Sequence, residues 1–144
     1  MTFSGQQVML DTGFLVALND LQDRHHAVAR DWLRRFSGSF VTTPQVITEV
    51  AFFLTVVNRA ALMDQIAMGW ITLVNPDALA YQRMSSLLHK YAECDPDLAD
   101  ISLVWLAEQS GLRSIVTIDI NDFSTYRING RTRFDLVGWT KQPS

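Results

Sequence analysis

Five acidic residues fall where an unpaired carboxylate is costly, beside or within apolar segments of the chain. Asp11 follows the apolar run at residues 8–10, and Asp119 and Asp122 follow the β-branched run "SIVTI". Glu49 and Asp100 interrupt apolar stretches that have helical spacing. A carboxylate in apolar surroundings needs a partner to offset its lost hydration. These acids are therefore the residues best suited to shared chemistry.

Cation binding is the chemistry that fits a cluster of carboxylates. Like charges raise one another's pKa, so a cluster of four persists most easily when a cation neutralises it. Oxygen ligands without His or Cys select Mg²⁺ or Mn²⁺. One or two such ions activate water and stabilise the attacking and leaving oxygens of an in-line displacement, which indicates phosphoryl chemistry.

Each acid also has a local explanation. Asp11 could cap a following helix, and Asp100 could stabilise the positive end of a helix. Glu49 could be an exposed helix residue, and Asp119 and Asp122 could form a turn. Local roles do not explain why the acids gather at one edge of the fold expected below.

The triplet Asp11-Thr12-Gly13 raises two other classes of enzyme. Aspartic proteases carry it, and their paired carboxylates share a proton and activate water. They need an all-β fold, whereas this triplet precedes "FLVALND" and a chain rich in helical spacing. Phosphatases that form an aspartyl-phosphate carry a second Asp two residues after the first, where this chain has Gly13. Neither class fits the pattern as well as a metal site.

Apolar periodicity predicts strands that alternate with helices. The expected strands cover residues 8–10, 40–44, 70–76, 113–119 and 134–139. The expected helices cover two segments within 13–36 that break near 19–20, and then 45–57, 60–68, 77–92 and 98–110. We expect helix starts at Asp23, at Thr43-Pro44 and at Asn75-Pro76, and a helix end at Gly111.

This alternation predicts a parallel sheet with helices on both faces and right-handed crossovers. Ligands of open α/β sheets bind beyond the carboxyl ends of the strands. Asp11 and Asp119 each end an expected strand, so two strands deliver acids to the same rim. Glu49 and Asp100, each near a helix start, add two more.

Length and composition indicate one ordinary globular domain. The 144 residues are 48% apolar and 19% charged. With a net charge of −3, the chain as a whole has no positive electrostatic field that would attract nucleic acid. Two clusters of arginines, within 24–35 and 127–133, could still form a basic surface around the acidic site. The single Cys94 excludes an intrachain disulfide. With no basic secretory start and no apolar run of about 18 residues, we expect a cytoplasmic protein with no membrane association.

Four segments resemble the PIN-domain family, and specifically its VapC-type toxin ribonucleases. They span Met9 to Arg127 in the family's order and read "MLDTGFLVAL", "TPQVITEVAFFL", "DPDLADISLVWLAE" and "IVTIDINDFSTYR". The last is the most specific, because a Thr-x-Asp-x-x-Asp-Phe pattern follows a β-rich run. The resemblance implies a single PIN-like domain over residues 1–144, a three-layer α/β/α sandwich with a central, mainly parallel sheet.

The resemblance also implies an activity and a site. The activity is a Mg²⁺-dependent endoribonuclease, with Mn²⁺ as a possible substitute, that cleaves single-stranded or looped RNA with metal-activated water and leaves a 5′-phosphate and a 3′-hydroxyl. By motif, the catalytic acids are Asp11, Glu49, Asp100 and Asp119, and the metal set is Asp11, Asp100, Asp119 and Asp122. Thr12 and Thr117 match the family's supporting hydroxyls, and Thr117 braces a carboxylate.

Several neighbouring residues leave alternatives open. Asp97 and Asp95 lie close enough to Asp100 in sequence to enter the pocket in its place, although the family's register favours Asp100. His25 and His26 are candidates for general acids or RNA contacts, and a solvent-exposed helix start is the simpler interpretation.

Partners are implied by the resemblance and by one apolar stretch. Toxins of this family pair as homodimers and are held by an antitoxin. The stretch "VAFFLTVV" has more apolar residues than one buried helix face needs, so it is either a central helix buried on all sides or an exposed patch for such a partner. The alternative function is a catalytically weak PIN-like module that binds RNA or protein in RNA processing.

Overall fold

Five parallel strands form the centre of the fold in the computed structural model, which describes residues 6–140. The domain expected over residues 1–144 also includes residues 1–5 and 141–144, which lie outside the described range. The strand order is β3-β2-β1-β4-β7. The strands are β1 (Gln6–Leu10), β2 (Gly38–Thr42), β3 (Ile71–Leu73), β4 (Ser114–Val116) and β7 (Asp135–Leu136).

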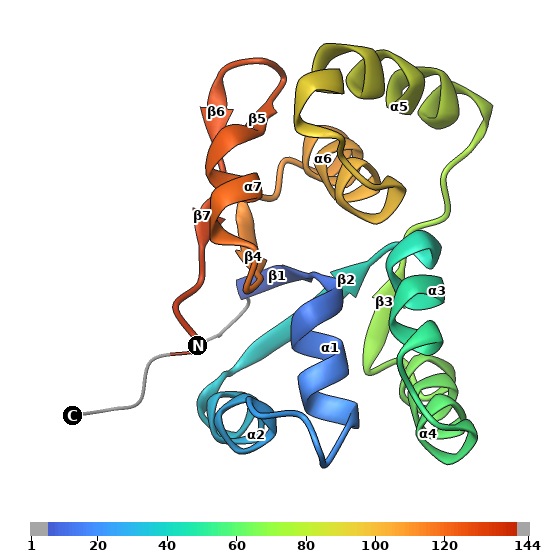
Figure 1. Ribbon diagram of the computed structural model, residues 1–144, viewed down its shortest axis with the longest axis vertical. Helices are drawn as coiled ribbons and strands as arrows, with labels where there is room; N and C mark the ends of the chain where they lie inside the picture. The colour runs from blue at the N-terminus through green and yellow to red at the C-terminus, as the bar shows by residue number, and fades with distance from the viewer. Residues whose placement is uncertain (1–5, 141–144) are drawn as a thin grey trace.

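Helices cover both faces of this sheet, which confirms the expected three-layer α/β/α sandwich. In Figure 1, α5 and α6 lie above the sheet, and α1, α2 and α4 lie below it. The central strand β1 is accordingly buried on both faces at Val8, Met9 and Leu10. The helices are α1 (Thr12–Asn19), α2 (His26–Arg35), α3 (Pro44–Phe52), α4 (Val56–Ala67), α5 (Ala78–Lys90), α6 (Leu98–Ser110) and the short α7 (Ile120–Thr125).

Two expected helix boundaries are confirmed by their chemistry. Thr43 caps α3, with its Oγ1 accepting from Val46 N at 3.3 Å, and Pro44 takes the first helical position. Gly111 ends α6 with φ of 79°, in the left-handed region where a residue without Cβ is least strained.

Three expected helix boundaries are wrong. The helix expected at 45–57 is two helices, because Thr55 caps α4 through Asn58 N at 3.3 Å. Helix α2 begins at His26 rather than after Asp23, whose carboxylate accepts from His25 N before the helix. Helix α5 begins at Ala78, two residues beyond Pro76, because the carboxylate of Asp77 caps it. At α4 and α5 a polar side chain satisfies a free N–H group in the first turn of the helix, whereas α2 has no side-chain cap.

Apolar periodicity does not predict three short elements of the fold. Two of them follow β4: helix α7, and the antiparallel hairpin of β5 (Arg127–Ile128) with β6 (Thr132–Arg133). The third is the 3₁₀ turn η1 (Ala92–Cys94), which precedes α6. Each is too short to show a period, so only the tertiary structure reveals it. The hairpin had one local signal, the dipeptide Asn129-Gly130 at its turn.

The Asp11-Thr12-Gly13 triplet lies between β1 and α1. Asp11 is the N-cap of α1, and its N–H extends the β1–β4 ladder to Val116 O at 3.1 Å. A Cβ at position 13 would come within 2.6 Å of Ile118 Cγ1, so glycine permits the close approach of the β4 loop. A strand-to-helix junction in a parallel sheet excludes the all-β protease arrangement. Within residues 6–140, no helix has the length and apolar character to cross a membrane.

Candidate metal centre

Asp11 is buried at the carboxyl end of β1, with both its oxygens engaged. Oδ1 accepts from Thr12 N at 2.7 Å, and Oδ2 accepts from Thr117 Oγ1 at 2.7 Å. Burial raises the pKa of Asp11 to about 6, against the lowering effect of these two hydrogen bonds. The carboxylate is thus held in one orientation while its negative charge remains poorly compensated.

Asp100 reaches the same place from the first turn of α6, where it is 4% exposed. Its N–H donates to Asp97 Oδ1 at 2.8 Å, and its Oδ2 accepts from Tyr126 Oη at 3.2 Å. Burial first, and then the charge of Asp11, raise the pKa of Asp100 well above the ordinary value. The fold therefore places two acids together that repel each other when both are ionised.

Asp119 completes a group of three carboxylates from the loop after β4. Thr117 ties this loop to Asp11, because its Oγ1 accepts from Asp119 N at 2.8 Å while donating to Asp11. One oxygen from each of Asp11, Asp100 and Asp119 lies within 4.8 Å of the others. Burial and the neighbouring Asp122 raise the pKa of Asp119.

The residues at this centre fit a divalent cation. The three carboxylates offer only hard oxygen atoms, as Mg²⁺ and Mn²⁺ prefer. Their raised pKa values mean that the group is unstable as a set of anions without a positive charge among them. A dication between them would remove that repulsion, which no Lys or Arg ion pair does within the described residues.

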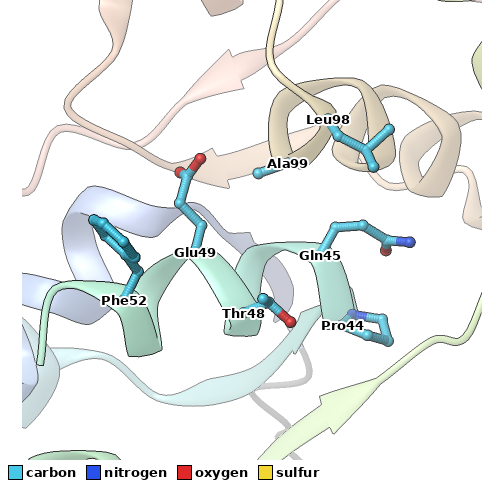
Figure 2. Close-up of a pocket in the computed structure, with 7 residues that line it drawn as sticks. All are labelled: Pro44, Gln45, Thr48, Glu49, Phe52, Leu98 and Ala99. Atoms are coloured by element: carbon cyan, nitrogen blue, oxygen red, sulfur yellow. The ribbon is translucent and has the colours of Figure 1, made fainter.

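The two remaining expected acids lie beside the group of three. Asp122 is in the first turn of α7, and its carboxyl raises the pKa of Asp119. Glu49 is half-buried on α3 and lines a groove of about 490 Å³ between α3 and the start of α6. Figure 2 shows Glu49 rising from α3 between Phe52 and Gln45, toward the side where Ala99 of α6 lies. Because Ala99 precedes Asp100, the groove adjoins the carboxylates.

The expected hydroxyl contacts divide into one that forms and one that does not. Thr117 braces two acids, as described above. The Thr12 hydroxyl is buried without a hydrogen-bond partner among the described residues, and within them only the Thr12 backbone N–H reaches Asp11.

The structure also places the neighbouring acids and histidines that the sequence left open. Asp97 caps α6 and raises the pKa of Asp11 through space, while the group of three contains Asp100 and neither Asp97 nor Asp95. His25 and His26 stand at the start of α2, as expected, but both side chains are half-buried and not fully exposed to solvent. His26 Nδ1 lies 2.8 Å from Ala17 O, and the His25 ring packs edge-on against Trp139.

The apolar stretch after Glu49 is exposed rather than buried on all sides. Phe52 is 80% exposed and Val57 78% exposed, with Phe53 and Val56 also exposed, while Leu54 joins the core. The break between α3 and α4 turns these side chains outward. We call Phe52, Phe53, Val56 and Val57 the α3–α4 patch.

Two residues that support the site were not expected from the sequence. Tyr126 is buried and donates to Asp100, and Trp139 Nε1 donates to Thr117 O at 3.0 Å. Both residues lie on short segments after β4. A buried Tyr O–H or Trp N–H needs a hydrogen-bond partner, but the residue type does not indicate which group that partner is.

Comparison with known proteins agrees with this arrangement. The PIN domain family model matches residues 8–128. Ribonuclease VapC26 of Mycobacterium tuberculosis is 26% identical over 134 residues, which are 90% of this chain and 99% of that protein.

Two solved structures share the fold. VapC20 of Mycobacterium tuberculosis, described as a toxin that cleaves the sarcin-ricin loop, superposes with a TM-score of 0.69 at 18% identity, over 79% of this chain and 91% of that one. A toxin–antitoxin complex from Klebsiella pneumoniae superposes with a TM-score of 0.62 at 18% identity, over 91% and 96%.

Proposed function

Since the chain belongs to the PIN domain family, we propose that it is a Mg²⁺-dependent endoribonuclease and the toxin of a toxin–antitoxin pair. The observation that carries the proposal is the convergence of Asp11, Asp100 and Asp119 within 4.8 Å at one end of a parallel sheet. The match to a ribonuclease over most of both chains supports RNA as the substrate. We place the activity in the cytoplasm.

The residues divide into those that hold the cation and those that act around it. Asp11 and Asp100 are the principal ligands, and Asp119 and Asp122 complete the metal set. When bound, the cation supplies positive charge to the scissile phosphate and makes a nearby water more acidic. Thr117 and Tyr126 keep the carboxylates of Asp11 and Asp100 oriented, so their geometry costs no reorganisation during the reaction.

Glu49 is placed to handle the proton of the attacking water, with Asp119 as the other candidate. Glu49 lines the groove, is half-buried and lies outside the group of three. A water oxygen attacks phosphorus in line as it gives up a proton to this carboxylate. The bond from phosphorus to the 3′ oxygen breaks, and that oxygen takes up a proton. The products are a 5′-phosphate and a 3′-hydroxyl.

A cleavage assay on total RNA tests this proposal. Wild-type protein with Mg²⁺ should cleave RNA, whereas EDTA or Asp11→Asn should abolish cleavage. The matched control is Asp77→Asn, which alters a helix cap remote in sequence from the metal set. Undiminished cleavage by Asp11→Asn or in EDTA contradicts the proposal. Mg²⁺-independent RNA binding without cleavage would favour the binding-module alternative.

We also propose an antitoxin and a homodimer as partners. The fold match to a toxin–antitoxin complex supports the antitoxin, and the α3–α4 patch offers apolar surface that a partner would cover. Sedimentation of the purified chain tests the dimer, because a clean monomer at micromolar concentration contradicts it. Co-purification with the product of the neighbouring reading frame tests the antitoxin, and Val57→Asp should weaken whichever association uses the patch.

A further inference from the structure

The hairpin of β5 and β6 concentrates positive charge in a chain whose net charge is −3. Its seven residues, "RINGRTR" at 127–133, contain three arginines and no acid. Asn129 and Gly130 both take positive φ, 53° and 74°, and Arg131 N donates to Ile128 O at 3.1 Å to close the turn. The Asn-Gly pair favours a turn with positive φ at both residues, so the local sequence stabilises this hairpin.

Two cations from other elements join the hairpin. Lys90 ends α5, and its Nζ would lie 3.3 Å from a Cβ added at Gly130, so the ammonium lies against the turn. Arg113 precedes β4, and its Nε donates to Arg133 O at 3.3 Å. We call Lys90, Arg113, Arg131 and Arg133 the hairpin basic surface.

All four residues of the hairpin basic surface are exposed, and the Lys90 ammonium also lies 5.3 Å from the centroid of the Tyr91 ring. None of them forms an ion pair within residues 6–140. Arg127 is different, because its Nη1 donates to the carbonyls of Ser124, Thr125 and Tyr126 and so fastens the end of α7. We therefore leave Arg127 out of the surface and assign it a structural role.

The tyrosine directly before the hairpin contacts the metal centre, and a second tyrosine, which packs edge-on against the first, holds the first residue of the hairpin. Tyr126, which donates to Asp100, directly precedes the hairpin. Tyr91 Oη accepts from Arg127 N at 2.9 Å, and Arg127 is the cross-strand partner of Arg133. The hairpin therefore begins one residue after a side chain that contacts a site carboxylate, and Arg131, the first hairpin residue of the basic surface, follows Tyr126 by five positions.

We propose that the hairpin basic surface binds phosphates of an RNA strand whose scissile phosphate lies at the metal centre. The inference rests on the proposed ribonuclease function and adds the surface that holds the rest of the substrate. An acidic centre in an acidic protein repels a polyanion, so a substrate of this charge needs a cationic surface beside the centre. An acidic protein partner fits less well, because no large apolar side chain is exposed on residues 127–133 and the α3–α4 patch lies on other elements.

Counterion release sets the expected size of the effect. For single strands, the logarithm of the binding constant falls by about 0.7 per contacted phosphate for each tenfold rise in salt. Each contact is thus worth roughly fivefold in affinity at about 0.1 M salt, relative to 1 M. Loss of two contacts should weaken binding by about 25-fold and reduce the salt slope by about 1.4.

The test compares Arg131→Gln/Arg133→Gln with Arg30→Gln/Arg34→Gln. The second pair is on α2, is also exposed and also unpaired within the described chain, and removes the same charge. Figure 1 places α2 and the hairpin at opposite ends of the molecule. All proteins carry Asp11→Asn and are kept in EDTA, so a labelled 20-nucleotide RNA of mixed sequence is bound and not cut. Unchanged melting temperatures establish that both pairs fold.

The hairpin variant should lose about 25-fold in affinity with the lower salt slope, while the α2 variant stays within about threefold of the parent. Equal losses in both variants, or none in the hairpin variant, would overturn the proposal. So would competition by polyglutamate as effective as competition by unlabelled RNA at equal charge, which would assign the surface to acidic proteins. Cleavage by the chain with its native Asp11 is measured separately. RNA binding through the hairpin without any cleavage would refute the nuclease and not the surface.

Discussion

Replacement of Asp11 by Asn should stabilise the metal-free protein even as it removes the proposed activity. Asp11 is buried, and its carboxylate faces the charges of Asp119 and Asp97. Its pKa is raised from 3.8 to about 6, so the folded state holds the Asp11 proton more tightly than the unfolded chain does. The ionised side chain therefore lowers stability at neutral pH. An amide of nearly the same shape does not ionise.

The size of this effect follows from the raised pKa. Each tenfold change in proton affinity is worth about 1.4 kcal/mol, so ionised Asp11 costs about 3 kcal/mol near pH 7. Each of the two Asp11 oxygens accepts a hydrogen bond, whereas the Asn amide has only one carbonyl oxygen. The variant therefore loses one hydrogen bond, which lowers its stability by about 1 kcal/mol. The net gain is about 2 kcal/mol, or roughly 6–8 °C in melting temperature for a chain of this length.

Thermal unfolding in EDTA at a series of pH values measures the effect. The cost of Asp11 is absent below pH 3.8, grows as the pH rises toward about 6, and is complete above that value. The advantage of Asp11→Asn should therefore be largest at pH 7–8 and vanish near pH 4. Mg²⁺ should raise the melting temperature of the wild type more than that of the variant, because the cation binds the folded state.

The matched control is Asp77→Asn, an isosteric change at an exposed helix cap. It should show no such gain at any pH. A melting temperature of Asp11→Asn equal to or below that of the wild type at pH 7–8 in EDTA would refute the argument that this carboxylate is destabilised by its surroundings.

Four further substitutions test how the site and helix α6 are supported. Thr117→Val should lower the free energy of unfolding by about 1.5–3 kcal/mol and the cleavage rate by at least tenfold, because the Thr117 hydroxyl makes two hydrogen bonds. Thr12→Val should change neither the free energy of unfolding nor the cleavage rate, because the Thr12 hydroxyl has no hydrogen-bond partner among the described residues. Tyr126→Phe removes a hydrogen bond that lowers the pKa of Asp100, so at limiting Mg²⁺ the pH of half-maximal cleavage should rise; an unchanged pH profile would argue against that contact. Arg83→Met breaks a bidentate ion pair with a mostly buried carboxylate on α6 and should cost about 1–3 kcal/mol of stability with cleavage chemistry intact.

Local patterns in the chain were enough to predict most of the fold. The alternation of strands and helices follows from apolar periodicity, which each segment carries within itself. The start of α3 at Thr43-Pro44 and the end of α6 at Gly111 follow from the backbone preferences of those residues. The positions of Asp11 and Asp119 at strand ends also lie in the sequence, and the parallel arrangement then implies that both face the same rim.

Local patterns do not determine the helix boundaries or the exposure of a long apolar segment. Apolar periodicity predicts one helix over residues 45–57, whereas the cap at Thr55 divides this run and leaves Phe52 and Val57 exposed. Apolar residues at helical spacing do not reveal whether a neighbouring element covers them. The cap at Thr55 decides the direction in which the chain leaves α3, and with it the existence of the α3–α4 patch.

Local spacing predicts that acids follow two strands and lie on two helices, because strand ends and helix periodicity depend on neighbouring residues. Which acids share one space, and what holds them, depends on how distant segments pack. Thr117 braces Asp11 across 106 positions of sequence, and it does so because β1 pairs with β4. Tyr126 reaches Asp100 because β5, which directly follows Tyr126, packs against α6. Such contacts depend on how distant segments pack, which no local spacing records.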